Sequence, residues 1–392
     1  MASESPRITP AKMGFLGVGW LGAQFFWGFH SGSMPLFLRS FTESKFTISL
    51  VLSLAGVTGC LVPPVVGYLS DRSFTRFGRR KPYIFAGFLG VFVCLLGLPH
   101  VSAIGAAALI SGLMYFSLRT AETPYLSLLP DITPPQQRST ASGVMNMFGS
   151  IGLIACFGIS SAIWGRRPVT VFNLVALVSF LSMMLALVLI REPDHPEENA
   201  SGPTLPLNYI KGLISETNVL KFFLAQFFLW LGFWMISSFL TLFAVEELNA
   251  PEGKSLLVPM VFAVVATVFM VPLGILGDRF GRKGILSVML GFWAVLCVIM
   301  GLSQTFEQAL VTVAITGIPF AALMGVGYAY LLDLIPKDRT AEFVGFSIIS
   351  VAVAQIVGPL GGGKLIDALG YRSLFPSAAV MMIVGLAILQ FT

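Results

Sequence analysis

The chain alternates between long apolar stretches and short polar breaks along its whole length. Each apolar stretch is close to the 20 or so residues that an α-helix needs to cross the hydrocarbon core of a bilayer. The pattern therefore predicts an all-α integral membrane protein with twelve transmembrane helices. The expected limits are 13–38, 46–70, 82–100, 103–130, 139–164, 168–190, 219–245, 255–277, 284–303, 306–333, 341–366 and 372–391.

The longest polar break, 191–216, separates the first six helices from the last six. It contains the run REPDHPEENASGPTLP, which is rich in proline and glutamate and is typical of a linker. We therefore expect an N-terminal six-helix half over 1–190, a cytoplasmic linker over 191–216 and a C-terminal six-helix half over 217–392.

The composition supports the membrane class and gives an orientation. Hydrophobic residues make up 56% of the 392 residues and charged residues only 11%, whereas soluble domains are about one quarter charged. Sixteen of the 24 Lys and Arg residues fall on the side of both termini, and seven fall in loops on the other side. The positive-inside rule then places both termini in the cytoplasm, with the protein in the cell inner (plasma) membrane. Because the net charge of +5 is spread over short loops, no nucleic-acid partner is expected.

The sequence holds an internal repeat with an offset of about 202 residues. AQFF at 23–26 returns at 225–228, and LLPDITPPQQRSTASG at 128–143 is echoed by YLLDLIPKDRTAEFVG at 330–345. Between them, GYLSDRSFTRFGRRK at 67–81 returns as GILGDRFGRK at 274–283, with SFTR inserted in the first copy. Two parallel six-helix repeats predict a pseudo-two-fold axis along the membrane normal, with a substrate site between them near the midplane.

The repeated loop resembles the signature of the major facilitator superfamily, Gly-x-x-x-Asp-Arg followed by Gly-Arg-Arg/Lys. The resemblance covers nearly the whole chain and implies the major facilitator fold, with alternating access by rocking of the two halves. The loop glycine is expected to let a helix end approach its neighbour, and the loop aspartate to face a helix N-terminus. The arginines are expected to gate by pairing with carboxylates in one state only, and topology signalling alone is the other interpretation. The matching residues are Gly67, Asp71, Arg72, Gly78, Arg79 and Arg80, then Gly274, Asp278, Arg279, Gly281 and Arg282.

Within that superfamily, the first half is similar to the sucrose:proton symporters of the glycoside-pentoside-hexuronide branch. The matching stretches are GAQFFW at 22–27 and VGYLSDRSFTRFGRRKPYI at 66–84, including the four inserted residues. PYLSLLPDI at 124–132 is similar to the end of helix 4 in the wider glycoside group, which includes melibiose carriers. The second half matches more generically, so the implied substrate class rests on the first half.

Two opposite charges, Arg119 and Glu122, lie inside the fourth apolar stretch near the middle of the bilayer. A charge at that depth costs roughly 2.5–3.5 kcal/mol on insertion scales, so both side chains are expected to face the bundle interior or a water-filled cavity. Their spacing places them on one helix face, within reach of each other. One interpretation is a structural ion pair that only fixes packing. The other is a proton site, because burial favours a neutral carboxyl group and a nearby guanidinium favours a carboxylate.

The resemblance to melibiose-type carriers supports the proton site. Glu122 precedes Pro124 by two residues, where those carriers place a coupling carboxylate. The helix-4 aspartate of sucrose-type carriers falls near Tyr115 here, and the second apolar stretch lacks the acids of a sodium-coupled site. The resemblance thus implies coupling to protons rather than sodium, with Glu122 as the proton carrier and Arg119 as its switchable partner.

Aromatic and amide side chains recur at helical spacing in the first and seventh stretches. Sugars need flat aromatic surfaces for their C–H faces and polar groups for their hydroxyls. The alternatives are an interfacial belt for the tryptophans and a satisfied interior position for the histidine. The predicted substrate-binding residues are Gln24, Trp27, His30, Tyr125, Asn146, Gln226, Trp230, Trp234, Tyr328 and Gln355.

No cofactor and no metal site are expected. GPLGGGKL at 358–365 nearly matches a phosphate-binding loop, but Leu365 replaces the Ser or Thr that would hold Mg²⁺. These glycines are expected instead to permit close helix packing in the eleventh helix. The four cysteines have no CxxC spacing, which indicates neither a metal site nor a disulfide framework. They are Cys60, Cys94, Cys156 and Cys297.

The sequence therefore predicts a secondary active transporter, a symporter of protons with a sugar or glycoside, acting as a monomer. A rival within transport is a proton-driven exporter of amphipathic compounds, whose cavity the many Phe, Met and Trp residues would line. A membrane enzyme would need a nucleophile, a metal cluster or an acid dyad, and His30, His100 and His195 are too widely separated to suggest one. A non-transporting sensor would have lost the loop aspartate or the intramembrane charges, and neither is lost.

Overall fold

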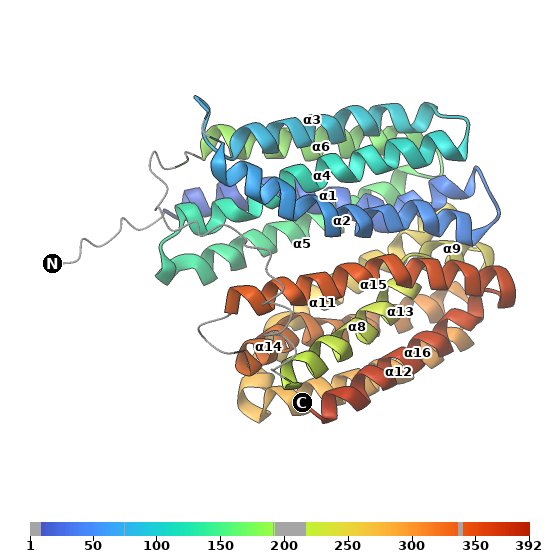
Figure 1. The fold of residues 1–392 in the computed structure, drawn as a ribbon. Helices are drawn as coiled ribbons and strands as arrows, with labels where there is room; N and C mark the ends of the chain where they lie inside the picture. The colour runs from blue at the N-terminus through green and yellow to red at the C-terminus, as the bar shows by residue number, and fades with distance from the viewer. Residues whose placement is uncertain (1–8, 74, 191, 193–216, 336–339) are drawn as a thin grey trace. The chain divides into compact units, whose positions relative to one another are not determined.

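The computed structural model describes residues 9–73, 75–190, 192, 217–335 and 340–392, and Figure 1 traces their helices from blue to red. Within these ranges every regular element is helical, apart from one isolated bridge between Thr75 and Gly78. The expected linker lies outside the described residues except at position 192. The elements before it are α1 (Pro10–Arg39), α2 (Lys45–Arg72), α3 (Lys81–Gly97), η1 (Leu98–His100), α4 (Ile104–Ile132), η2 (Pro135–Gln137), α5 (Arg138–Ile163) and α6 (Pro168–Leu189).

The helices after the linker include three that are subdivided. The expected seventh helix is divided into α8 and α9, and the eighth begins with the short α10. The expected tenth helix contains η3, a π-helical segment, between α13 and α14. The elements are α8 (Thr217–Ser237), α9 (Leu240–Glu246), α10 (Glu252–Ser255), α11 (Leu257–Phe280), α12 (Arg282–Leu302), α13 (Phe306–Ala322), η3 (Leu323–Gly327), α14 (Tyr328–Leu334), α15 (Thr340–Leu369), η4 (Tyr371–Ser373) and α16 (Leu374–Gln390).

All twelve expected helices are confirmed, with limits that differ from the prediction by less than one helical turn. In the described part of the chain, eleven helices are long and apolar enough to cross a membrane. α1 is as long as these but is not among them, because Gln24, His30 and several Ser and Gly residues dilute its apolar character. That helix needs protein neighbours on its polar face, which is consistent with its many contacts to α4 described below.

The chain clusters into two compact units. The first comprises Met1–His30 and Thr58–Thr204, and the second comprises Ser31–Val57 and Leu205–Thr392. The C-terminal part of α1 and the N-terminal part of α2 thus belong to the second unit. Because the units divide these two helices, the boundaries of the six-helix halves stay a prediction.

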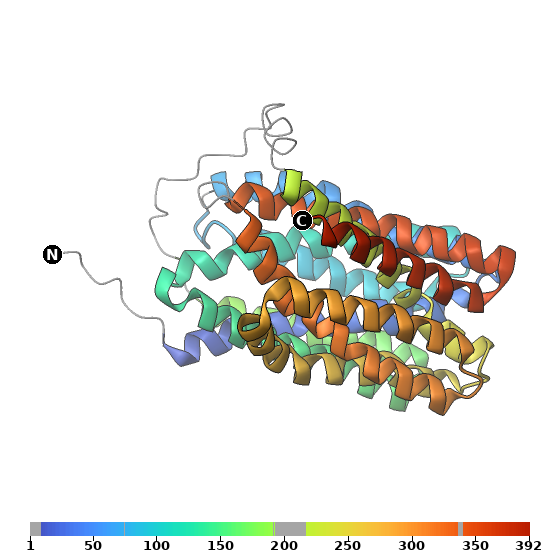
Figure 2. The ribbon, with the colours of Figure 1, turned by 90° about the horizontal axis from the view of Figure 1, so that it is seen from below.

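In the first unit, α3 packs against both α4 and α6, and Figure 1 shows the three helices next to one another. Figure 2 shows the same ribbon from below. Glycines on α3 allow the close approach to α4. A Cβ built on Gly87 would lie 2.5 Å from the carbonyl oxygen of Ser117, and one on Gly90 would lie 2.5 Å from the Ser117 hydroxyl. Small residues at such positions let two membrane helices gain van der Waals contact along their backbones.

We expect Gly87→Ala to destabilise the protein although alanine is the better helix former. The added methyl group has no room against the α4 backbone, and such overpacking typically costs about 1–3 kcal/mol. Gly97→Ala is the matched control on the same helix, because a Cβ there meets nothing within 4 Å. Thermal unfolding in detergent should show a lower melting temperature for Gly87→Ala only; equal melting temperatures would contradict the close α3–α4 contact.

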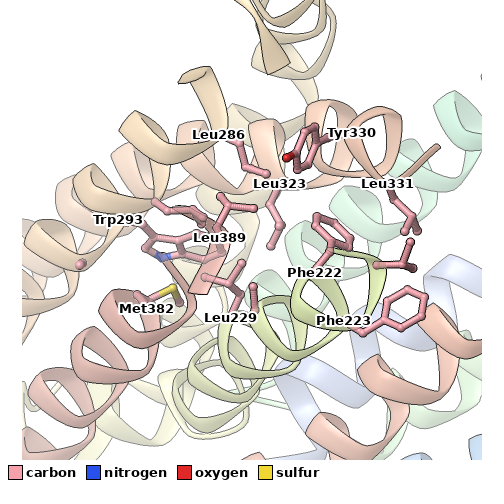
Figure 3. Close-up of a cluster of buried hydrophobic side chains, with 14 of the residues drawn as sticks. Phe222, Phe223, Leu229, Leu286, Trp293, Leu323, Tyr330, Leu331, Met382 and Leu389 are labelled. Atoms are coloured by element: carbon pink, nitrogen blue, oxygen red, sulfur yellow. The ribbon is translucent and has the colours of Figure 1, made fainter. Parts of the chain in front are cut away.

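The hydrophobic core of the second unit lies where α8, α12, α14 and α16 meet, as Figure 3 shows. Phe222 and Leu229 of α8 point into it, and Trp293 of α12 and Met382 of α16 lie together on one side. This core fixes the position of α8, which carries three of the predicted substrate-binding residues.

The glycine run of α15 has the packing role that the sequence predicts. A Cβ on Gly358 would lie 2.9 Å from the Cβ of Trp234 and 3.0 Å from the carbonyl oxygen of Leu231. The run lies inside a helix and not after a strand. The close-packing interpretation is therefore confirmed, and α15 approaches the backbone of α8 at this point.

Candidate functional site

Arg119 and Glu122 form an ion pair on α4, as their spacing predicts. Nη1 of Arg119 donates a hydrogen bond of 3.0 Å to Oε2 of Glu122. The side chain of Glu122 is only 5% exposed and that of Arg119 is 22% exposed. The carboxylate is therefore enclosed by protein, and the guanidinium keeps partial access to the space beside it.

The other oxygen of Glu122 is held by α1. Nε1 of Trp27 donates to Oε1 of Glu122 at 2.6 Å. The guanidinium of Arg119 also lies over the Trp27 ring, 4.7 Å from its centroid. Trp27, predicted as a substrate contact, thus connects α1 to both members of the ion pair.

A second polar contact lies one turn from Trp27 along α1 and one turn from Arg119 along α4. Nδ1 of His30 and the hydroxyl of Tyr115 are 2.7 Å apart, and both side chains are buried. The His30 ring packs edge-on against the rings of Trp27 and Tyr115, with centroids 5.2 Å away in each case. His30 therefore occupies an interior position with a hydrogen-bond partner, and Tyr115 stands where sucrose-type carriers are expected to have an aspartate.

Arg119 keeps one hydrogen-bond donor free. Its Nε is buried and has no hydrogen-bond partner among the described residues. Gly59 of α2 leaves the room for this side chain, since a Cβ there would lie 3.2 Å from Nη2 of Arg119. The unused donor suits a guanidinium that can change partner. The proton site and the structural ion pair both stay predictions.

A third aromatic residue of α1 was missed in the sequence. Trp20 stacks on Tyr125 with centroids 6.4 Å apart and rings nearly parallel, and its buried Nε1 has no hydrogen-bond partner in the part of the chain that the structure describes. Gly149 of α5 makes the space, because its Cβ would lie 2.6 Å from Trp20 and 3.0 Å from Gln24. The spacing along the chain could have identified Trp20, since Trp20, Gln24 and Trp27 share one face of α1.

The other predicted residues of the first unit lie apart from the ion pair. Tyr125 is fully buried, and its hydroxyl donates to the carbonyl oxygen of Leu16. Asn146 is exposed on α5, and its amide donates to the carbonyl oxygen of Ser142 one turn earlier. Their substrate contacts stay predictions.

The second unit brings three predicted residues together in one cavity of about 210 Å³. Gln226 and Trp230 line it from α8, and Tyr328 lines it from the start of α14. Oε1 of Gln226 accepts a hydrogen bond of 2.9 Å from the Ser347 hydroxyl, which orients the amide. The remaining lining residues are Phe222, Leu323, Met324, Gly327 and Leu331.

The π-helical segment η3 forms part of this cavity wall. It follows Pro319, which removes one backbone donor from the helix, and π-helical turns are frequent at functional sites. Trp230 stacks on Trp234 at a centroid distance of 6.4 Å. The Nε1 of Trp234 and the hydroxyl of Ser237 are buried without partners among the described residues. Gln355 is buried on α15 and is not among the cavity-lining residues.

Two carboxylates pair with the arginine side chains of the loop before α3. Nη2 of Arg79 donates to Asp131 at 3.0 Å, and Nε of Arg80 donates to the same oxygen. The Arg80 guanidinium also pairs with Asp71 at 3.2 Å. Asp131 ends α4, so this network ties the α2–α3 loop to the helix that carries Glu122.

The second unit repeats this network. Arg282 pairs with Asp278 at 2.8 Å and with Asp333 at 2.7 Å. Asp333 follows Asp131 by the repeat offset of 202 residues. Both loops also turn at a glycine with positive φ, +110° at Gly78 and +92° at Gly281, which explains why glycine stands there twice.

Two details of the loops differ from the expectation. A Cβ on Gly67 would be 3.8 Å from Thr123, an ordinary contact, and one on Gly274 would meet nothing within 4 Å. The expectation of a close helix approach at Gly67 is therefore wrong. The helix N-terminus is faced by Glu192 rather than by Asp71, because the Glu192 carboxylate accepts from the backbone N–H groups at positions 79, 80 and 81.

The family model of the Major Facilitator Superfamily matches residues 16–251 and 222–392, which together span almost the whole chain. The chain belongs to the major facilitator superfamily. It is a membrane transporter of a small-molecule substrate, not an enzyme, and its helices make it a multi-pass membrane protein.

Several relatives within the superfamily are named for what they transport. The probable galactarate/D-glucarate transporter GarP of Escherichia coli is 26% identical over 371 residues, covering 83% of this chain and 81% of its own. The sucrose transport protein SUC3 of Arabidopsis thaliana is 25% identical over 163 residues, covering 36% of this chain and 27% of its own. The crystal structure of the nucleoside transporter NupG superimposes with a TM-score of 0.78 at 14% identity, covering 98% of this chain and 99% of its own. The NupG match shows the fold alone.

In this transporter, charged residues also fix the α1–α2 connection within the second unit. Arg39 and Lys45 both pair with Glu246 of α9, at 3.0 and 2.9 Å. Asp367 of α15 accepts from the backbone N–H groups of Lys45 and Phe46, at 2.8 and 3.0 Å. Asp367 thereby caps the N-terminus of α2, where a negative charge is favoured by the helix dipole.

Proposed function

We propose that this transporter is a symporter that couples the entry of a sugar or glycoside to protons by alternating access. The observation that carries the proposal is the buried carboxylate of Glu122 in a membrane-spanning helix, held by Arg119 and Trp27. Ionisable groups at such positions are expensive and commonly serve proton relays. The names of GarP and SUC3 support a polyhydroxylated substrate.

Each unit offers its own candidate contacts for a substrate. Gln24 and Trp20 on α1 offer an amide and an indole N–H, and the cavity of the second unit offers Gln226, Trp230 and Tyr328. Such a set pairs flat aromatic rings with hydrogen-bonding groups, which is the combination that a sugar ring needs. The loop networks at Asp131 and Asp333 would hold one conformation and open in the other.

We further propose that the protein lies in the cell inner membrane as a monomer, with both termini in the cytoplasm. The excess of Lys and Arg in the loops on the side of the termini supports this orientation.

Uptake into proteoliposomes tests the coupling. A panel of radiolabelled sugars and glycosides would be supplied with an inward pH gradient, and a trapped pH dye would report proton entry. We expect one class of sugar to accumulate and to acidify the lumen. Sugar entry without acidification, or with sodium dependence, would refute proton symport.

A proton-driven exporter of amphipathic compounds is the second candidate. The apolar side of the cavity, with Phe222, Leu323 and Met324, favours it. Competition separates the two functions: tetraphenylphosphonium should displace a bound sugar weakly if the protein is a sugar symporter and strongly if it is an exporter.

We expect Trp230→Leu to weaken binding of the transported sugar about two- to tenfold. An aromatic contact contributes about 0.5–1.5 kcal/mol beyond buried area, and leucine fills the space without a ring. Trp230→Phe is the matched control, since it keeps a ring at the cavity wall. Isothermal titration should give an affinity close to that of the native protein for Trp230→Phe, and unchanged affinity in Trp230→Leu would exclude this ring from the substrate site.

A further inference from the structure

The loop between α2 and α3 presents two arginines that stack on aromatic rings. The guanidinium of Arg72 lies 3.7 Å from the centroid of the Tyr68 ring, and that of Arg76 lies 4.7 Å from the centroid of the Phe77 ring. Both arginines are exposed. A guanidinium over an aromatic face keeps its in-plane N–H groups free for a further ligand.

These two arginines differ from their neighbours in the same loop. Arg79 and Arg80 are engaged by Asp131 and Asp71. Arg72 and Arg76 form no ion pair among the described residues. The loop therefore carries two positive charges that the network at Asp131 does not neutralise.

The position of this loop determines which molecules it can contact. Both helices are candidate membrane spans: the span of α2 ends at Arg72, and that of α3 begins at Lys81. Four residues of chain reach at most about 14 Å, so Phe77 stays within that distance of the start of α3. The Phe77 side chain is 63% exposed, and Leu69 of α2 is 45% exposed. This places an exposed ring and two arginines at the depth of lipid headgroups.

Local hydrogen bonds hold the loop in this shape. The Thr75 hydroxyl donates to the carbonyl oxygen of Gly78 at 2.6 Å and accepts from the Phe77 N–H at 3.3 Å. The Ser73 hydroxyl lies 2.6 Å from that of Tyr83 on α3. The arginines are thus presented by a folded turn, which lowers the entropy cost of binding a ligand.

We propose that Arg72 and Arg76, flanked by Tyr68 and Phe77, bind the phosphate group of an anionic phospholipid such as phosphatidylglycerol. Guanidinium groups bind phosphate oxygens through paired N–H donors, and aromatic rings settle at the membrane interface. Juxtamembrane basic residues are attracted to anionic leaflets. The proposal does not depend on the identity of the transported substrate.

The second unit supplies an internal control. Its corresponding loop lacks the inserted SFTR residues and carries one exposed arginine, Arg279, before Phe280. Phe280 is 72% exposed, so the two loops offer similar apolar surface. They differ in the number of exposed arginines that form no ion pair with a described residue, which is the feature that the proposal depends on.

Lipid binding is tested on the full-length protein in detergent with an equimolar mixture of phosphatidylglycerol and phosphatidylcholine. Native mass spectrometry gives the ratio of the two bound lipids. Each arginine near an anionic surface contributes about fivefold, so Arg72→Gln with Arg76→Gln should lower the preference for phosphatidylglycerol about thirtyfold. Arg279→Gln is the control and should lower it fivefold or less. If the double variant aggregates, Arg76→Gln alone should give a fivefold loss.

Three results would overturn the proposal. One is a preference within about twofold of the native protein in both the double and the single variant. Another is an equal loss on Arg279→Gln and on the double substitution, which would indicate general charge attraction. The last is displacement of the lipid by inorganic phosphate at equal concentration, which would indicate a site for a free anion.

Discussion

Glu122→Gln is expected to abolish accumulation of substrate against its gradient while leaving substrate exchange largely intact. Glutamine keeps the size of the side chain and can still accept the hydrogen bond from Trp27, but its amide does not bind and release a proton as a carboxyl group does. A carrier that needs protonation at this position would then cycle only with substrate bound. Proteoliposomes loaded with unlabelled substrate measure exchange, and empty ones under a pH gradient measure accumulation.

The matched control is Glu307→Gln, a carboxylate in the first turn of α13 that is far along the chain from the ion pair. It should leave both activities within about twofold of the native protein, because an exposed first-turn charge contributes typically 0.3–1 kcal/mol. Accumulation by Glu122→Gln at the native level would refute the coupling role. The ion pair with Arg119 would then be structural.

Asp131→Asn is expected to give the second large effect, a loss of stability together with slower transport. The substitution removes the shared charge partner of Arg79 and Arg80, and the Arg80 side chain is only 7% exposed. Breaking a fully buried pair costs about 3–5 kcal/mol, and we expect about 2 kcal/mol here because the Asp131 side chain is 24% exposed. Thermal unfolding and initial uptake rate measure the two losses.

Asp333→Asn gives the corresponding change in the second unit. Its partner Arg282 is 32% exposed and Asp333 is 52% exposed, so the expected cost is below about 1 kcal/mol. The difference in lost stability between Asp131→Asn and Asp333→Asn is the result that tests the effect of burial. Equal losses of melting temperature in the two variants would show that burial does not govern the strength of these networks.

The helices were predictable because length and hydropathy are local properties of a membrane protein. Every spanning segment must satisfy its own backbone hydrogen bonds, so α3, α4 or α12 can be read from their own residues alone. The ion pair of Arg119 and Glu122 was predictable for the same reason, since both residues lie within one helical turn. The subdivision of the tenth helix at η3 was not, because a π-turn leaves no mark in the apolar pattern.

Contacts between helices could not be predicted. Trp27 and Glu122 are 95 residues apart, and His30 and Tyr115 are 85 apart. Periodicity shows which face of a helix is polar but not which partner it meets. The sequence assigns Glu192 to the linker, whereas in the structure it caps the start of α3. The sequence could not show this, because a single carboxylate after a helix has no pattern that distinguishes a linker residue from a cap.

The surroundings of Glu122 also bear on how a proton would act there. Both described partners of the carboxylate, the indole of Trp27 and the guanidinium of Arg119, can only donate hydrogen bonds. Each carboxylate oxygen has two lone pairs, so a proton could bind at a site that neither N–H group uses. The proton would remove the negative charge that attracts the Arg119 guanidinium and strengthens the bond from Trp27. Protonation of Glu122 would in this way weaken the contact between α1 and α4 at this point.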